Sequence, residues 1–98
     1  MAQPLTVVAE MQAKPGRESD LRSALLSLLE PTRKEEGCIQ YDLHVHTDHP
    51  GRFVFYEIWA SRERLTLHLA RPYMQAFITA SEALLAEPMR VATYTRIG

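Results

Sequence analysis

Both faces of one predicted β-strand are apolar in the segment RFVFYEIWA, residues 52–60. Side chains alternate between the two faces of a strand, which separates the segment into Phe53, Phe55, Glu57 and Trp59 on one face and Val54, Tyr56 and Ile58 on the other. A strand that is apolar on both faces is expected to be covered on both faces. We therefore predict a sheet with helices against one face and a second copy of the chain against the other.

The residues before and after this segment predict an alternation of strands and helices. Apolar and polar residues alternate over 5–13, 39–46 and 89–97, which predicts three further strands. Leucines three and four positions apart predict a helix from Arg17 that exits at Gly37, with Pro31 expected to kink or end it. Ser61 is expected to cap a second helix, and Pro72 to begin a third that ends at Pro88.

The order β-α-β-β-α-α-β is typical of an α+β, ferredoxin-like fold, a split β-α-β sandwich with an antiparallel sheet and helices on one face. With 98 residues and no linker, we expect residues 1–98 to form a single domain. The doubly apolar strand predicts a homodimer that forms through the sheet faces.

Composition excludes several classes of protein. A net charge of −1 and a pI near 6.4 argue against a nucleic-acid partner. The single cysteine, Cys38, rules out an intrachain disulfide, and we interpret it as a buried structural residue. Without a visible leader or an apolar run long enough to span a bilayer, we expect a soluble cytoplasmic protein with no membrane partner.

Three histidines, His44, His46 and His49, follow one another closely at the end of the second predicted strand. Three imidazoles could hold a divalent metal ion with one open position. No carboxylate or cysteine completes a known ligand spacing around them, so we predict no metal site.

Four motifs resemble those of the antibiotic biosynthesis monooxygenase domain family: EEGCIQY at 35–41, FVFYEIW at 53–59, His68, and Pro72-Tyr73. The resemblance covers nearly the whole chain, in order and with matching spacing. It implies a ferredoxin-like dimer that oxidises quinols or polyphenolic aromatics with O₂, without a flavin, haem or metal cofactor. The expected partners are then a small aromatic substrate and O₂.

Two departures from the wider family narrow what the resemblance implies. Haem-degrading members carry Asn, Trp and His where this chain has, at or near those positions, Ala9, His68 and Ile78, so haem degradation is not expected. Many relatives also carry a histidine after the proline of the last helix, where this chain has Tyr73. A mechanism that needs two helix histidines is therefore not expected.

Three residues are the candidate catalytic groups. His68 lies near the apolar stripe of its helix, where it could take a proton from a phenolic substrate near neutral pH, with Glu57 or Tyr73 assisting. His68 and Glu57 each have a competing structural interpretation. His68 would only hydrogen-bond the edge of the core, and Glu57 would form an ion pair at the dimer interface.

The candidate ring-binding residues are aromatic: Tyr41, Tyr56, Trp59 and Phe77. Clustered aromatics are more often core than binding site, and the sequence leaves open which face of 52–60 lines the pocket. Two alternative functions also stay open. An isomerase of a small phosphorylated sugar would need Arg64 or Arg71 to point into the pocket. A non-catalytic dimeric module would have a cavity too small for a ring, or filled by Trp59 and Phe77.

Overall fold

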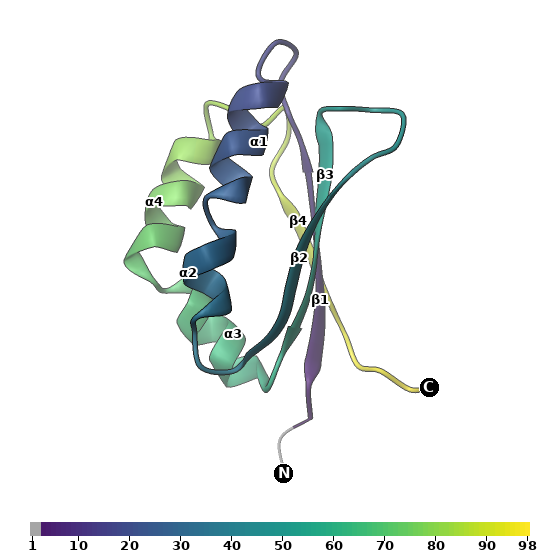
Figure 1. Cartoon of the computed structure of the whole chain (residues 1–98), viewed down its shortest axis with the longest axis vertical. Helices are drawn as coiled ribbons and strands as arrows, with labels where there is room; N and C mark the ends of the chain where they lie inside the picture. Colours follow the sequence, from purple (N-terminus) through teal and green to yellow (C-terminus); the bar gives the residue numbers. More distant parts are fainter. Residues whose placement is uncertain (1–2) are drawn as a thin grey trace.

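A four-stranded antiparallel sheet carries all the helices on one of its faces (Figure 1). The computed structural model describes residues 3–98. Its strands are β1 (Leu5–Gln12), β2 (Cys38–Val45), β3 (Arg52–Trp59) and β4 (Arg90–Tyr94), in the spatial order β2-β3-β1-β4. This order, with β1 between β3 and β4, confirms the predicted ferredoxin-like α+β fold.

The first predicted helix is divided into two, α1 (Glu18–Leu26) and α2 (Leu29–Arg33). The break lies at Ser27 and Leu28, and the carbonyl of Ser27 is the one that an N–H at position 31 would bond in a continuous helix, so the interruption agrees with the prediction that Pro31 kinks or ends the helix. Pro31 itself lies in the first turn of α2, where the N–H groups have no helical acceptor and a missing one costs no hydrogen bond.

The last two helices, α3 (Arg62–Leu69) and α4 (Pro72–Ser81), begin as predicted, but α4 ends well before Pro88. After Ser81 the chain turns to join the end of β1. The amide of Lys14 donates to the carbonyl of Leu84 at 2.8 Å, and the amide of Ala86 donates to the carbonyl of Gln12 at 2.8 Å. These bonds to the sheet replace further helical turns.

The final strand is shorter than the predicted 89–97. Its last pair joins Tyr94 to Thr6, one residue from the start of β1 at Leu5. β1 extends only one residue beyond this pair, so the chain after Tyr94 has almost no neighbouring strand with which to form hydrogen bonds.

Alternate residues of the sheet separate a buried face from an open one. Val7 and Met11 of β1 and Phe53 of β3 are buried beneath the helices, against Leu21 and Leu25 of α1. On the opposite face Val54 and Ile58 are half-buried and Tyr56 is 39% exposed. Among the described residues, no helix is both long enough and apolar enough to cross a membrane.

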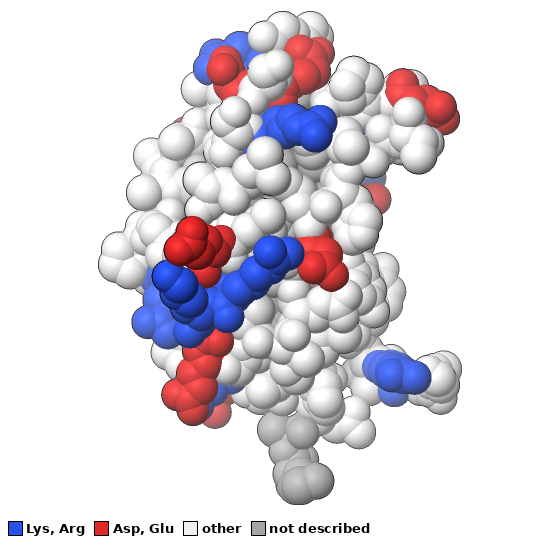
Figure 2. Space-filling model, viewed as in Figure 1, with Lys and Arg blue, Asp and Glu red and all other residues white. Residues whose placement is uncertain are grey.

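Charged side chains of both signs are mixed on the surface that Figure 2 shows. Around α2 and α3 they form ion pairs, which join Lys34 to Glu30, Arg33 to Asp42 and Arg64 to Glu36. This face has no broad surface of a single sign, in keeping with the near-neutral net charge.

Candidate active site

His68 is held against the sheet by the way α3 begins and by the period of its buried residues. The hydroxyl of Ser61 accepts a hydrogen bond from the amide of Arg64 at 3.3 Å, which caps the helix as predicted. Leu65 and His68, three positions apart, then share the inward side. His68 is only 1% exposed, and its ring lies against that of Trp59 with centroids 4.6 Å apart.

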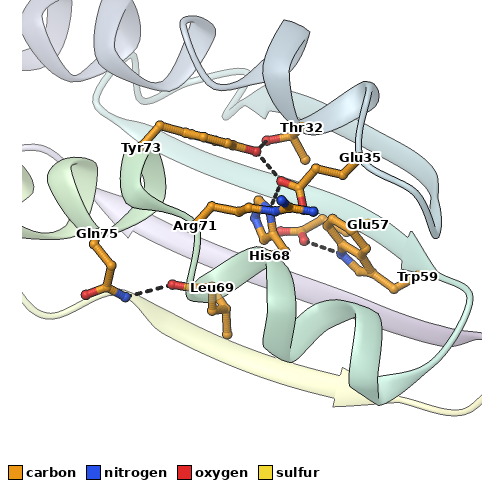
Figure 3. A network of polar contacts seen from close by, with 9 residues as sticks. All are labelled: Thr32, Glu35, Glu57, Trp59, His68, Leu69, Arg71, Tyr73 and Gln75. Atoms are coloured by element: carbon orange, nitrogen blue, oxygen red, sulfur yellow. Dashed lines mark hydrogen bonds and ion pairs between the residues drawn. The ribbon is translucent and has the colours of Figure 1, made fainter.

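The carboxylate of Glu35 anchors one nitrogen of the His68 ring (Figure 3). Nδ1 of His68 lies 2.8 Å from Oε2 of Glu35, whose side chain is 6% exposed just beyond α2. The same carboxylate accepts hydrogen bonds from the hydroxyl of Tyr73 and, at 3.2 Å, from Nε of Arg71. A carboxylate at Nδ1 favours the tautomer with the proton on that nitrogen, which leaves the lone pair on Nε2.

This environment keeps Glu35 ionised and His68 neutral near pH 7. Burial raises the pKa of Glu35, but hydrogen bonds from His68 and Tyr73 outweigh it and bring the pKa below its usual value. Burial lowers the pKa of His68 more than its contact with Glu35 raises it. A neutral imidazole with a free Nε2 is the form that can accept a proton.

Glu57 is a second titratable group on the buried face of β3. It is 5% exposed, and its Oε1 accepts a hydrogen bond from Nε1 of Trp59 at 2.8 Å. Burial raises the pKa of Glu57 to about 7, so the carboxyl is partly protonated at neutral pH. Because Glu57 faces the helices, it cannot form an ion pair across the open face of the sheet.

His68 and Glu57 line the same small cavity between the helices and the sheet. The rest of its lining is apolar or aromatic: Val7, Ala9, Leu28, Tyr41, Phe55, Leu65, Leu69, Met74, Phe77, Met89 and Val91. Its volume is about 30 Å³. One water molecule takes about 30 Å³ in the liquid, and an apolar cavity of about 150 Å³ binds benzene. In this conformation the cavity admits a water molecule but no aromatic ring.

The structure brings most of the predicted site residues together. Four of them line the cavity: His68, Glu57, Tyr41 and Phe77. Trp59 and Tyr73 do not line it. The ring of Trp59 lies against that of His68, and the hydroxyl of Tyr73 donates to Glu35. Tyr56 lies on the open face of β3, so a role in binding a ring inside this cavity does not fit its position.

Glu35 is the functional candidate that sequence reasoning missed: it appeared in the helix exit and in the motif at 35–41, but no role was assigned to it. The buried hydroxyl of Thr32, 3.0 Å from that of Tyr73, was missed as well. Only one local signal pointed to this turn: Gly37, whose φ of 91° marks a tight turn two residues after Glu35.

The residues that the alternative chemistries require do not line the cavity. Arg64 pairs with Glu36 at 3.1 Å and Arg71 with Glu35, and neither contributes to the cavity wall. His46 and His49 lie with ring centroids 4.6 Å apart. Within residues 3–98, no three His, Cys, Asp or Glu side chains are grouped so as to hold a metal ion.

Comparison with known proteins settles the family. A model of the antibiotic biosynthesis monooxygenase family matches residues 4–80. The chain belongs to this family. Membership confirms the resemblance found in the sequence motifs, and the matched segment contains Glu35, Glu57, His68 and Tyr73.

Individual proteins are similar to this chain in sequence and in structure. "Putative monooxygenase Rv0793" of Mycobacterium tuberculosis is 34% identical over 91 residues, which cover 93% of this chain and 89% of that protein. Its solved structure has a TM-score of 0.92 at 31% identity, covering 98% of this chain and 97% of that one. The structure of PA3566 from Pseudomonas aeruginosa has a TM-score of 0.94 at 33% identity, covering 100% and 98%.

A third relative is longer than this chain. The uncharacterized protein sll1783 of Synechocystis is 31% identical over 91 residues, which cover 93% of this chain. The match spans only 62% of the length of that protein.

Proposed function

We propose that the protein is a cofactor-independent monooxygenase that oxidises a small quinol or polyphenolic aromatic with O₂. The observation that carries the proposal is the placement of His68. Glu35 holds Nδ1, and within the described residues Nε2 has no hydrogen-bond partner, while the ring lines an apolar cavity. Family membership supports the reaction class, and the buried base supports the step that begins it.

Removal of a phenolic proton starts the reaction. Nε2 of His68 takes the proton, and the resulting anion transfers one electron to O₂, which gives a semiquinone and superoxide. These combine at a ring carbon to form a peroxide anion, which takes the proton back from His68 and becomes a hydroperoxide. The hydrogen on that carbon then leaves as a proton while the O–O bond breaks: the distal oxygen departs as hydroxide and takes up this proton to give water, and the proximal oxygen stays on the ring as a carbonyl. For a simple quinol the sum is quinol plus O₂ to hydroxyquinone plus water, so the substrate supplies all the electrons.

The surroundings of His68 support these steps. Ionised Glu35 stabilises the imidazolium that forms when His68 accepts the proton. Glu57, with a pKa near 7, can donate a hydrogen bond to a second ring oxygen in its protonated form. The apolar wall keeps water away from the radical pair. Tyr73 acts through Glu35, because it contacts the carboxylate from outside the cavity.

Oxygen uptake tests the proposal. Metal-stripped wild type, His68→Ala and His49→Ala are given a panel of one-ring and two-ring quinols in an oxygen electrode. We expect uptake above autoxidation with wild type and with the His49→Ala control, since His49 is an exposed turn residue. Uptake should fall about 100-fold or more in His68→Ala, as for loss of a general base. Equal uptake by wild type and His68→Ala would remove His68 from the mechanism, and no uptake on any quinol would refute the function.

The volume of the cavity favours a second candidate, a dimeric binding module without catalysis. A cavity of about 30 Å³ is too small for a ring unless side chains move. A module of this kind would show no oxygen uptake with any quinol. The oxygen electrode therefore separates the two candidates.

We further propose that the active form is a homodimer that joins the open faces of two sheets. The centre of that face is apolar and is formed by Val8, Val54, Tyr56, Ile58, Ala92 and Tyr94, with polar residues towards its margins. A symmetric pairing would remove this surface from water.

A further inference from the structure

The cavity has a mouth, which the exposure of its lining reveals. All but three of the lining residues are buried, and the three are Leu69, Met89 and Val91. Leu69 ends α3, whereas Val91 lies on β4 beside Ala9 and is 50% exposed. The cavity therefore approaches the surface between the end of α3 and the start of β4.

Met89 separates this cavity from a larger hollow. A surface groove of about 500 Å³ lies between the end of α4 and the segment 82–89, and Met89 is the residue that lines both spaces. Most of the groove lining is apolar, including Ile78, Leu85 and Pro88. Displacement of the Met89 side chain would join the two spaces, which would give a ring the volume that the closed cavity lacks.

The segment that carries Met89 is held by few backbone hydrogen bonds and can therefore move. The last backbone bond before it is the one from Ala86 to Gln12, and β4 begins at Arg90. Between them, residues 87–89 make no backbone hydrogen bond to any described residue. Methionine is also unbranched, with three rotatable side-chain bonds, and changes shape at little cost.

The charges along this route have one sign. Glu82 and Glu87 lie on the groove, and Glu57 lies inside the cavity. No lysine or arginine lines either space within the described part of the chain. The nearest cation on the segment, Arg90, is already 3.4 Å from Glu87. A ligand that carries a carboxylate or phosphate would meet acidic groups throughout and would lose its hydration without a partner.

We propose that Met89 is the gate of the active-site cavity, and that the groove beyond it admits uncharged aromatic rings and rejects anionic ones. The inference rests on the proposed function and deepens it, because it defines the substrate class and the entry route. Met89 is a specificity-determining residue in this scheme and takes no part in the chemistry.

Binding kinetics without oxygen test the gate independently of turnover. The probes are 4-methylphenol and 4-hydroxybenzoate, of similar size but different charge, mixed anaerobically with the protein in a stopped-flow instrument. The single tryptophan, Trp59, contacts His68 and Glu57 and reports on entry. The variants are Met89→Ala, Met89→Phe and the volume-conserving Met89→Leu, with Leu67→Ala on the exposed side of α3 as control.

We expect wild type to bind 4-methylphenol at least about tenfold more tightly than 4-hydroxybenzoate, as expected for a buried unpaired charge. Met89→Ala should raise the association rate about tenfold and Met89→Phe should lower it similarly, as expected for a gating side chain. Leu67→Ala should match wild type, and Met89→Leu should confirm that the fold survives. The double change Glu82→Gln with Glu87→Gln should bring the two affinities closer together.

The possible failures differ in meaning. If wild type binds the phenol but all Met89 variants associate at the wild-type rate, the gate is refuted and the proposed function stands. Equal or tighter binding of the benzoate would refute the charge selection. Failure of wild type to bind either probe would refute the gate, and the oxygen electrode would then decide the proposed function separately.

Discussion

The indole ring of Trp59 lies against the imidazole of His68, with centroids 4.6 Å apart and planes inclined by 33°. Trp59 is the only tryptophan of the chain, and His68 is the one histidine buried among the described residues. Tryptophan fluorescence is therefore placed to report the protonation of the candidate base.

A pH titration of that fluorescence should show quenching by the imidazolium, with a midpoint below the usual histidine pKa of 6.5, because burial lowers the pKa of His68. The titration is best made in the Glu57→Gln background, since Glu57 bonds to the indole and titrates near pH 7. His68→Phe should abolish the transition and His49→Ala should leave it. A midpoint above 6.5 would contradict the desolvated, neutral base.

Glu35→Gln should weaken the base without unfolding the protein. The amide keeps the shape of the carboxylate but cannot stabilise the imidazolium, so we expect kcat to fall at least about tenfold to 100-fold, the loss found when the hydrogen-bonding partner of a metal-bound histidine is removed. Nitrogen NMR of the imidazole provides a readout that does not depend on turnover. It should show loss of the preference for a protonated Nδ1, and an unchanged tautomer ratio would mean that Glu35 does not position His68.

Glu57→Gln should change how stability depends on pH. Glu57 has a folded pKa of about 7 against an ordinary value of 4.5, so its neutral form stabilises the native state at low pH. That contribution, of the order of 3 kcal/mol, is present below pH 4.5 and is lost as the pH rises through 7. Urea unfolding of wild type and Glu57→Gln between pH 4.5 and 8 measures this contribution as the difference between the two proteins. His68 changes stability with pH in the opposite direction, but it does so in both proteins, so its effect cancels in the difference. Parallel curves would contradict the raised pKa.

Gly37→Ala should destabilise the fold more than the matched change Gly16→Ala. Both glycines have positive φ, 91° and 84°, where a side chain costs of the order of 1 kcal/mol. At Gly37 the new Cβ would also collide with Cγ of Arg64, whereas nothing lies within 4 Å at Gly16. Thermal unfolding should therefore show a drop of about 4–8 °C for Gly16→Ala and a larger one for Gly37→Ala. Equal drops would mean that Arg64 moves aside freely.

Ile58→Glu should dissociate the proposed dimer, because it places a charge at the centre of the open sheet face. We expect the dissociation constant to rise by about 30-fold or more, which corresponds to loss of one interface hot spot. Leu26→Glu, on the exposed side of α1, is the matched control and should leave assembly unchanged. Sedimentation velocity over a range of concentrations measures both. A monomeric wild type would end the proposal.

Much of the fold was predictable because the information is local. Alternation in β1 and β3, the Ser61 cap and Pro72 at the start of α4 each depend on residues close in sequence. The predictions failed where a distant contact took over. The segment after Ser81 pairs with the end of β1, about 70 residues away, and no helical pattern can reveal such a partner.

The residues of the candidate site likewise separate into those that the local sequence predicts and those whose roles depend on distant contacts. His68 was recognisable from its place on a helix stripe and from a family motif. The role of Glu35 was not recognisable, although the residue belongs to the motif at 35–41, because its partners His68, Arg71 and Tyr73 are 33 or more residues distant. Tyr56 was the opposite case: period-two alternation already separates it from Glu57 and Trp59, and only the choice of the inward face was missing.

Because of that alternation, the odd and even positions of β3 have different proposed roles, one in the active site and the other in the dimer interface. Residues 53, 55, 57 and 59 point to the buried face, where Phe55 and Glu57 line the cavity, and residues 54, 56 and 58 point to the surface where a second chain would dock. Substitutions at even positions can thus change partner choice while the chemistry persists, and substitutions at odd positions can retune substrate preference in an unchanged assembly. A single inserted residue would exchange the two sets and abolish both at once.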